Sequence, residues 1–328
     1  YHLETKADLI WQIGTGYFGC RDTEGYFSSE KFSEKANLDN VKMIEIKLSQ
    51  GAKPGHGGIL PANKNSLEIA KVRGVEAHTQ VDSPPRHSAF ENHKELLLFI
   101  QKLRELSKGK PVGFKLAIGK KEEFIELCQT MHEMGIKPDF ITIDGGEGGT
   151  GAAPVEYTNS VGMPLREALV FVVDTLIGFD LKKDIKVIAS GRIIDGMDMV
   201  KALAIGADLC ASARGMMFAL GCIQALQCHK NKCPTGIATQ NKSLAKALVV
   251  EDKKQRVANF HEETLKSFVE IYASAGLSHP NQLNRTHIFY RIDQTDYKRY
   301  DELFVPLKEG ALLQKPYPKA YEHYMQRA

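Results

Sequence analysis

The chain alternates short runs of almost purely apolar residues with longer segments in which apolar residues recur at helical spacing. The short runs show little alternation of apolar and polar positions, which is typical of parallel strands buried on both faces. We therefore predict five strands and, before two consecutive prolines, a weaker sixth. The five are residues 41–48, 112–118, 139–143, 185–189 and 207–212, and the weaker one is 79–83.

Segments with a helical period lie between and after these strands. They are residues 93–107, 122–134, 165–177, 197–205, 216–227 and 253–275. A repeated strand–loop–helix order indicates βαβ units with right-handed crossovers, and the fold class is therefore α/β. We predict a (β/α)8 TIM barrel over residues 1–280, with about two of the eight strands lying before Tyr1. A helical C-terminal extension follows, and residues 281–328 form a tail that has no clear period from 293 onward.

Composition removes several classes of protein. Of 328 residues, 43% are hydrophobic and 25% charged, which is ordinary for a folded protein and excludes intrinsic disorder. The 43 basic and 40 acidic residues are well mixed, so we expect no nucleic-acid partner. No apolar run is long enough for a membrane helix. The chain opens on Tyr1-His2, neither a signal peptide nor an initiator Met, so we expect it to be part of a longer protein.

Every glycine cluster follows a predicted strand, and active sites of such barrels lie at the strands' C-terminal ends. Ser190-Gly191-Arg192 and Ala213-Arg214 follow the last two strands, and each offers free N–H groups and a guanidinium to a phosphate. The alternative is that tight turns simply require glycine, and two matching loops favour the phosphate. Lys115 lies inside an apolar strand, where it either reaches solvent at the rim or faces a cofactor such as a flavin.

Three of the six cysteines lie close together. Cys222, Cys228 and Cys233 follow the spacing C-x5-C-x4-C, and a proline comes next. Zinc sites prefer paired C-x2–4-C knuckles with four ligands, whereas iron–sulfur clusters take thiolates in runs that end in Cys-Pro. Buried free cysteines in a helix would explain Cys222 and Cys228 equally well. The spacing alone leaves both interpretations open.

Four stretches together resemble the FMN-binding glutamate synthase family, in its shorter glutamate-synthase-like form. They are IEIKLSQGAKPGHGGILP (44–61), SPPRHSAF (83–90), FITIDGGEGGTGAAP (140–154) and ALGCIQALQCHKNKCPTGIATQ (219–240). The resemblance covers roughly residues 1–280 and implies a barrel with FMN and a 3Fe–4S cluster. It implies cluster ligands at Cys222, Cys228 and Cys233, and substrate contacts from Gln50 and Lys53. It also implies FMN contacts from Lys115, Asp144, Gly145, Gly146, Ser190, Gly191, Arg192, Ala213 and Arg214.

The resemblance further implies an oxidoreductase acting on CH–NH2 donors, which reduces 2-iminoglutarate, formed from 2-oxoglutarate and ammonia, to glutamate. An electron-donor protein or subunit and a separate ammonia source are then expected, since the chain has no glutaminase portion. The expected location is cytoplasmic, with membrane association only through a part preceding Tyr1. His56 and Ile59 replace a Glu and a Gln of the family. A different 2-oxo or imino acid, or electron transfer to a partner, is therefore the alternative, and a non-catalytic scaffold the second.

Overall fold

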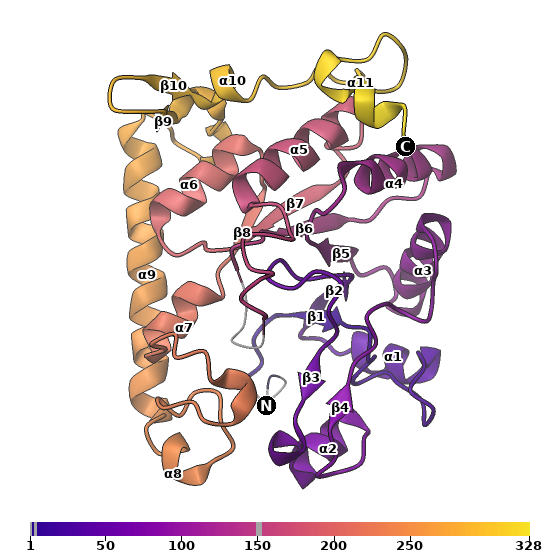
Figure 1. The fold of residues 1–328 in the computed structure, drawn as a ribbon, viewed down its shortest axis with the longest axis vertical. Helices are drawn as coiled ribbons and strands as arrows, with labels where there is room; N and C mark the ends of the chain where they lie inside the picture. The colour runs from indigo at the N-terminus through magenta and orange to yellow at the C-terminus, as the bar shows by residue number, and fades with distance from the viewer. Residues whose placement is uncertain (1, 3–4, 149–152) are drawn as a thin grey trace.

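A six-stranded parallel sheet forms the centre of the molecule. The computed structural model describes residues 2, 5–148 and 153–328, and its sheet has the strand order β1-β2-β5-β6-β7-β8 (Figure 1). All five pairings are parallel, as between Phe114 and Ile141 of neighbouring strands. The prediction of an α/β fold with buried parallel strands is confirmed. The strands are β1 (Leu9–Ile13), β2 (Val41–Lys47), β5 (Val112–Leu116), β6 (Phe140–Asp144), β7 (Lys186–Ser190) and β8 (Leu209–Ala211).

The predicted helices between the strands are present and pack on the sheet. Their ends follow local chemistry: the Asn92 side chain accepts a hydrogen bond from the Glu95 amide at one helix start, and left-handed Gly135 ends the next helix. Their apolar faces share one hydrophobic core with the strands. The predicted helices are α3 (His93–Leu106), α4 (Lys121–Met134), α5 (Leu165–Gly178) and α6 (Gly196–Ile205), and a further helix that was not predicted, α1 (Ser29–Ala36), lies between β1 and β2.

The sixth parallel strand is β1, and not the predicted strand at 79–83. Residues Val81–Asp82 (β4) instead pair antiparallel with Ile59–Leu60 (β3), outside the main sheet. The apolar pattern did not reveal β1 because Gln12 interrupts it. The Gln12 amide donates to the Glu45 carboxylate of the neighbouring strand, so a polar residue belongs there.

The segment that follows β8 is less helical than predicted. Helix α7 spans Arg214–Leu220 and ends at Gly221, whose left-handed backbone (φ 102°) stops it, so the prediction of a helix over 216–227 is wrong beyond residue 220. The cysteine region 221–240 is mostly loop. Short α8 (Lys242–Ala245) and long α9 (Val250–Ser274) follow, and α9 runs along the outside of α6 and α7 (Figure 1).

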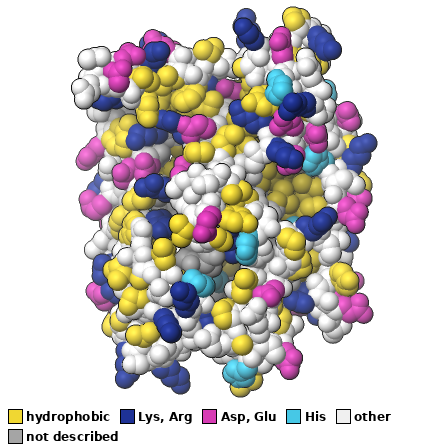
Figure 2. All heavy atoms as spheres, in the orientation of Figure 1, with side chains coloured by type: hydrophobic (Ala, Val, Ile, Leu, Met, Phe, Trp, Pro, Cys, Tyr) yellow, Lys and Arg dark blue, Asp and Glu magenta, His cyan; other side chains and the backbone are white. Residues whose placement is uncertain are grey.

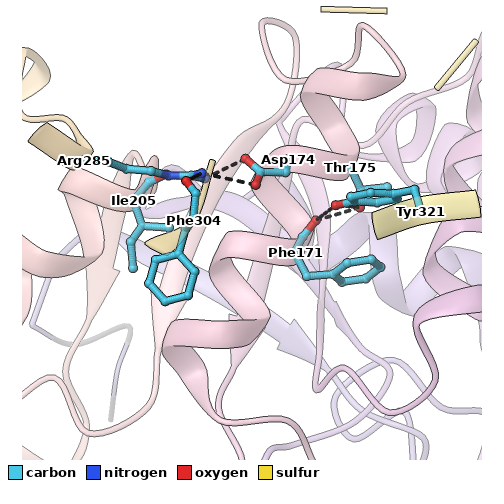
Figure 3. A network of polar contacts seen from close by, with 7 residues as sticks. All are labelled: Phe171, Asp174, Thr175, Ile205, Arg285, Phe304 and Tyr321. Atoms are coloured by element: carbon cyan, nitrogen blue, oxygen red, sulfur yellow. Dashed lines mark hydrogen bonds and ion pairs between the residues drawn. The ribbon is translucent and has the colours of Figure 1, made fainter. Parts of the chain in front are cut away.

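The C-terminal tail is structured and belongs to the same core. It contains a hairpin of β9 (Phe289–Arg291) and β10 (Tyr297–Arg299), then α10 (Tyr300–Leu303) and α11 (Lys319–Met325). The region from residue 293 onward, in which the sequence shows no clear period, thus contains short regular elements. Arg285 joins the tail to α5 through a double hydrogen bond with Asp174, at 2.6 and 3.2 Å (Figure 3). On α11, the Tyr321 hydroxyl lies 3.3 Å from that of Thr175.

The surface carries mixed charge. Figure 2 shows Lys and Arg side chains interspersed with Asp and Glu over the face in view, in line with the near balance of 43 basic and 40 acidic residues. Among the helices that the structure describes, none combines the length and the apolar character that a bilayer crossing demands.

Candidate active site at the carboxyl edge of the sheet

A cavity of about 440 Å³ lies where the strands β5 to β8 end. Residues predicted separately, as flavin contacts, as cluster ligands and, for Gln50, as a substrate contact, line this one space. They are Gln50, Lys115, Asp144, Ser190, Gly191, Arg192, Ala213, Arg214, Cys222, Cys228 and Cys233. The structure therefore brings together loops that are far apart in the sequence, as the parallel topology requires, because such strands present their carboxyl ends at one edge.

Asp144 is the polar centre of this edge. Its carboxylate accepts hydrogen bonds from the Ser190 hydroxyl and from the Gly51 amide, both at 2.8 Å, and it lies 3.5 Å from the Lys115 ammonium. The ion pair answers the question that the sequence left open for Lys115. Its side chain is only 19% exposed and is held at the cavity wall by a carboxylate, so it is not a rim lysine that reaches solvent.

Two of the predicted contacts, Gly145 and Gly146, do not line the cavity. The Gly145 amide donates to the Ser190 carbonyl at 2.8 Å, and the Gly146 amide donates to that of Met163 at 2.9 Å. A Cβ on Gly51 would come within 1.8 Å of the Gly145 carbonyl oxygen. These glycines thus allow two loops to touch, and their role as FMN contacts stays a prediction. Residues 149–152 of the same glycine-rich loop lie outside the described part of the chain.

The loop after β7 has a backbone that favours close approach of a ligand. Gly191 has a φ of +136°, and a Cβ there would lie 3.0 Å from the Gly145 amide nitrogen. Arg192 also has a positive φ, 50°. Such conformations cost a non-glycine residue free energy and collect at ligand sites. Arg192 and Arg214 both line the cavity, which gives it two guanidinium groups.

A second cavity, of about 340 Å³, adjoins the first, because Lys47 and Gln50 line both. Lys53, His56 and Arg73 line it too, and no Asp or Glu is among its described lining residues. Burial lowers the pKa of Lys53 and of Arg73. Burial likewise lowers that of Lys47, and the nearby Lys115 ammonium lowers it further. Concentrated, partly desolvated positive charge suits a small anion.

Sequence reasoning missed a pair of aromatic residues, Tyr17 and His87, of which His87 contacts the backbone of Lys47, a residue that lines both cavities. Tyr17 is fully buried, and its hydroxyl lies 3.1 Å from Nδ1 of His87 and accepts a hydrogen bond from the Ala89 amide. Nε2 of His87 lies 2.9 Å from the carbonyl oxygen of Lys47. Burial lowers the pKa of His87, so the neutral imidazole is favoured. The only signal for this pair was the location of His87 within the stretch SPPRHSAF.

The three cysteines line the first cavity, but they do not converge on a point. Among the described residues no group of three His, Cys, Asp or Glu side chains is arranged to hold a metal ion. Burial by itself would raise the pKa of Cys233, yet hydrogen bonds from the Thr235 hydroxyl and from nearby amides bring it below its ordinary value. The thiolate, which is the metal-ligating form, is thereby favoured.

Lys64, which the sequence did not single out, contacts the cysteine segment. Its ammonium donates to the carbonyl of Cys228 at 2.9 Å and to that of Ala238 at 3.3 Å. Burial lowers the pKa of Lys64, while the sulfurs of Cys228 and Cys233 act in the opposite direction. A lysine from the short 3₁₀ helix after β3 thus reaches the segment after α7.

A parallel α/β sheet with a cation-rich cavity at its carboxyl edge defines a class of proteins that bind small ligands there. The chain matches the family described as "Conserved region in glutamate synthase" over residues 1–278, and it belongs to the glutamate synthase family.

Relatives include the glutamate synthase large subunit-like protein YerD of Bacillus subtilis, which is 45% identical over 92% of this chain and 57% of its own length. The archaeal glutamate synthase (NADPH) of Methanocaldococcus jannaschii is 34% identical over 82% of this chain and 50% of its own length. The chain thus spans about half the length of these relatives. The chloroplastic ferredoxin-dependent glutamate synthase of Oryza sativa is 33% identical over 74% of this chain and 14% of its own length.

Among solved structures, one of mandelate oxidase superposes with a TM-score of 0.44 and 17% identity, covering 84% of this chain and 61% of that one.

Proposed function

We propose that this chain carries the synthase site of a glutamate-synthase-type oxidoreductase, which binds FMN and a 3Fe–4S cluster and reduces 2-iminoglutarate to glutamate. One observation carries the proposal: the Lys115–Asp144–Ser190 group and all three cysteines line a single cavity. Family membership supports it, since the relatives are named glutamate synthases.

The first cavity has the features that FMN requires. Its two arginines and the exposed turn at Gly191 suit the phosphate, and Lys115 supplies a cation to the isoalloxazine ring. Asp144 orients Lys115, and Ser190 and Gly51 in turn orient Asp144. When bound, the flavin would supply hydride to the imine carbon, and the cluster would supply the flavin with single electrons.

The second cavity has the features that a dicarboxylate requires. Lys53 and Arg73 offer positive charge, with no carboxylate among the described lining residues to compete, and Gln50 offers an amide at the border of the two cavities. The Lys47 ammonium holds Gln50 by a 2.8 Å hydrogen bond to Oε1, which turns the amide N–H2 toward other partners. Reduction of the imine takes two electrons and two protons. We assign binding roles here and no proton donor.

The donor chemistry of the cysteines fits an iron–sulfur cluster. Three thiols line the same space, one with its pKa lowered, and thiolates are the ligands such clusters take. Cys222 and Cys228 are half-buried in loop and 3₁₀ structure, so they are not the helix-core residues that the alternative interpretation of the spacing requires. We propose Cys222, Cys228 and Cys233 as the ligands.

The proposed reaction needs an electron donor and ammonia from elsewhere. The relatives' names mention NADPH in one case and ferredoxin in another, so the donor class differs within the family. We propose a separate electron-donor protein or subunit and a separate source of ammonia for this protein.

Absorbance, iron and sulfide analysis test the cofactors first. We expect a yellow-brown protein containing FMN, iron and sulfide, with Lys115→Met lowering FMN content and Cys228→Ser lowering iron. Cys210→Ser is the matched control, because Cys210 lies on β8 and does not line the cavity. A colourless protein without iron would favour the non-catalytic scaffold.

A second candidate function is the same chemistry on a different 2-oxo or imino acid. It is favoured by His56, which lines the second cavity, whereas Ile59, the other departure from the family pattern, is 51% exposed and is not among the residues that line it. The reduced protein, mixed with ammonia and either 2-oxoglutarate or shorter and longer 2-oxo acids, separates the two. Flavin reoxidation only by an acid other than 2-oxoglutarate would favour the second candidate.

A further inference from the structure

Lys64 lies at a junction between two parts of the site. It ends the short 3₁₀ helix Ala62–Lys64, which follows the loop that lines the second cavity at Gln50 and Lys53. Its ammonium is held by the carbonyls of Cys228 and Ala238, on either side of Cys233 in the sequence. One side chain therefore joins two points of the cysteine segment that are ten residues apart.

Hydrogen bonds within the cysteine segment (residues 221–240) also join its two halves, close to the residues that Lys64 contacts. The Thr239 hydroxyl donates to the carbonyl of Asn231 at 2.8 Å, and the Gln240 amide donates to Asn231 Oδ1 at 2.7 Å. The Asn231 amide in turn donates to the carbonyl of Asn63, at 3.3 Å, beside Lys64. Two consecutive residues, 63 and 64, thus contact the closed segment, and only Lys64 brings a charge.

In the part of the chain that the structure describes, no carboxylate pairs with that charge. Within the described residues Lys64 makes no ion pair, its hydrogen-bond acceptors are neutral carbonyls, and its side chain is half-buried. Carbonyl dipoles stabilise an ammonium without cancelling its net charge, and partial burial weakens the screening by water. The field of this cation therefore acts on whatever occupies the space next to Cys228 and Cys233.

We propose that Lys64 is a positioning residue that holds the cysteine segment closed and raises the reduction potential of the iron–sulfur cluster. This inference rests on the proposed function. Reduction adds one electron to the cluster and releases nothing, so the net charge becomes more negative by one. A fixed positive charge nearby stabilises the reduced form more than the oxidised form, and charge and hydrogen bonding are what set cluster potentials.

Potentiometric titration with dithionite, followed by the EPR signal of the cluster, tests the electrostatic part. Lys64→Met should lower the midpoint potential, with about a tenfold change in the equilibrium constant of reduction, which is about 59 mV for one electron. Lys64→Arg keeps the charge and should stay near the wild-type value. Lys71→Met is the matched control, since Lys71 lies on α2 (Leu67–Arg73), is exposed and has no hydrogen bond or ion pair to any described residue of the cysteine segment. An unchanged midpoint in Lys64→Met overturns the inference.

Thiol alkylation of the protein freed of metal tests the positioning part and does not depend on the cluster. Cys228 and Cys233 should react several-fold faster in Lys64→Met than in wild type, while Lys71→Met should match wild type. Equal alkylation rates in Lys64→Met and wild type would overturn the positioning role. This holds even if Lys64→Met does not retain iron, because the measurement uses protein freed of metal. Wild-type protein that never contains iron and sulfide would refute the proposed function, and the alkylation rates would still decide whether Lys64 holds the segment.

Discussion

At the scale of single residues, the ion pair between Arg285 and Asp174 is buried, with the two side chains only 7% and 6% exposed. Arg285 also donates to the carbonyl of Phe304 at 2.7 Å, so its guanidinium is satisfied on several sides (Figure 3). Burial raises the pKa of Asp174, and Arg285 opposes that shift. A buried pair of this kind adds little net stability as a unit, but losing one partner is costly.

Arg285→Met should therefore lower the free energy of unfolding by about 3–5 kcal/mol, because it leaves the Asp174 carboxyl buried without its cation. Urea unfolding measures this directly. Arg291→Met is the control, because Arg291 is exposed and stacks on the ring of Tyr297, and it should cost about 1 kcal/mol or less. Equal midpoints for the two variants would contradict the assignment.

Cys20 gives a prediction for alkaline pH. The thiol is fully buried, and burial raises its pKa from 9.0 to about 12, with Lys35 opposing. Between these values the folded chain keeps a proton that the unfolded chain releases. The stabilisation is thus present below pH 9 and is lost as pH rises toward 12, by about 1.4 kcal/mol per pH unit for one proton.

Urea unfolding of wild type and of Cys20→Ala at several pH values above 9 isolates the contribution of this thiol to the free energy of unfolding. The variant should show a shallower loss of stability with pH, whatever the constant offset from lost packing. Parallel curves would mean that Cys20 titrates normally in the folded state.

At the scale of elements, the strands that sequence reasoning located were those buried on both faces. Residues such as Phe114 and Ile141 gave an unbroken apolar signal. Strand β1 lacked this unbroken apolar pattern, because it contains Gln12, whose amide donates a hydrogen bond to the Glu45 carboxylate on β2. The segment 79–83 gave a strand signal, but nothing local reveals that its partner is Ile59–Leu60 and not the main sheet.

The candidate site likewise contains residues that the sequence could locate and residues that it could not. Local sequence patterns located some of its residues. Arg214 was found from its loop after a predicted strand and Cys233 from the cysteine spacing, and both line the first cavity. Lys64 could not be found from the sequence, because its contacts reach Cys228 across 164 residues. Gly145 was expected to contact FMN, and its amide donates a hydrogen bond to the carbonyl of Ser190 within the protein.

The packing of α6 on α9 depends on Gly196. A Cβ there would lie 2.5 Å from the Phe268 amide nitrogen, closer than such atoms can approach. Gly196→Ala should therefore cost about 1–3 kcal/mol of stability, as overpacking does. Gly119→Ala is the control, since a Cβ at Gly119 meets nothing within 4 Å, and it should be neutral or slightly stabilising. Urea midpoints compare the two, and equal effects would refute the contact.

At the scale of the whole molecule, the C-terminal tail completes the core although the family match ends at residue 278. Tyr300, Leu312, Tyr321 and Met325 are buried, and Leu312 packs so closely on Gly178 that a Cβ there would lie 2.6 Å away. The tail therefore covers apolar surface of α5 that water would otherwise reach.

Deleting residues 315–328 should expose that surface, because it removes Tyr321 and Met325. We expect loss of several degrees in the thermal midpoint, or insoluble protein. Removing only Arg327 and Ala328 is the control and should change little. Thermal unfolding of the three chains decides the matter, and an unaltered midpoint after the longer deletion would show that α11 contributes no packing.

The location of Asp144 has a consequence for biosynthesis. Its carboxylate needs Gly51, Lys115 and Ser190 as partners, and these are supplied by β2, β5 and β7 or the loops after them. During translation the chain must therefore emerge from the ribosome to well past residue 190 before this wall of the cavity can form. A nascent chain that stalls earlier lacks this wall of the cavity, so under the proposed function it could not bind a flavin there until β7 is synthesised and paired.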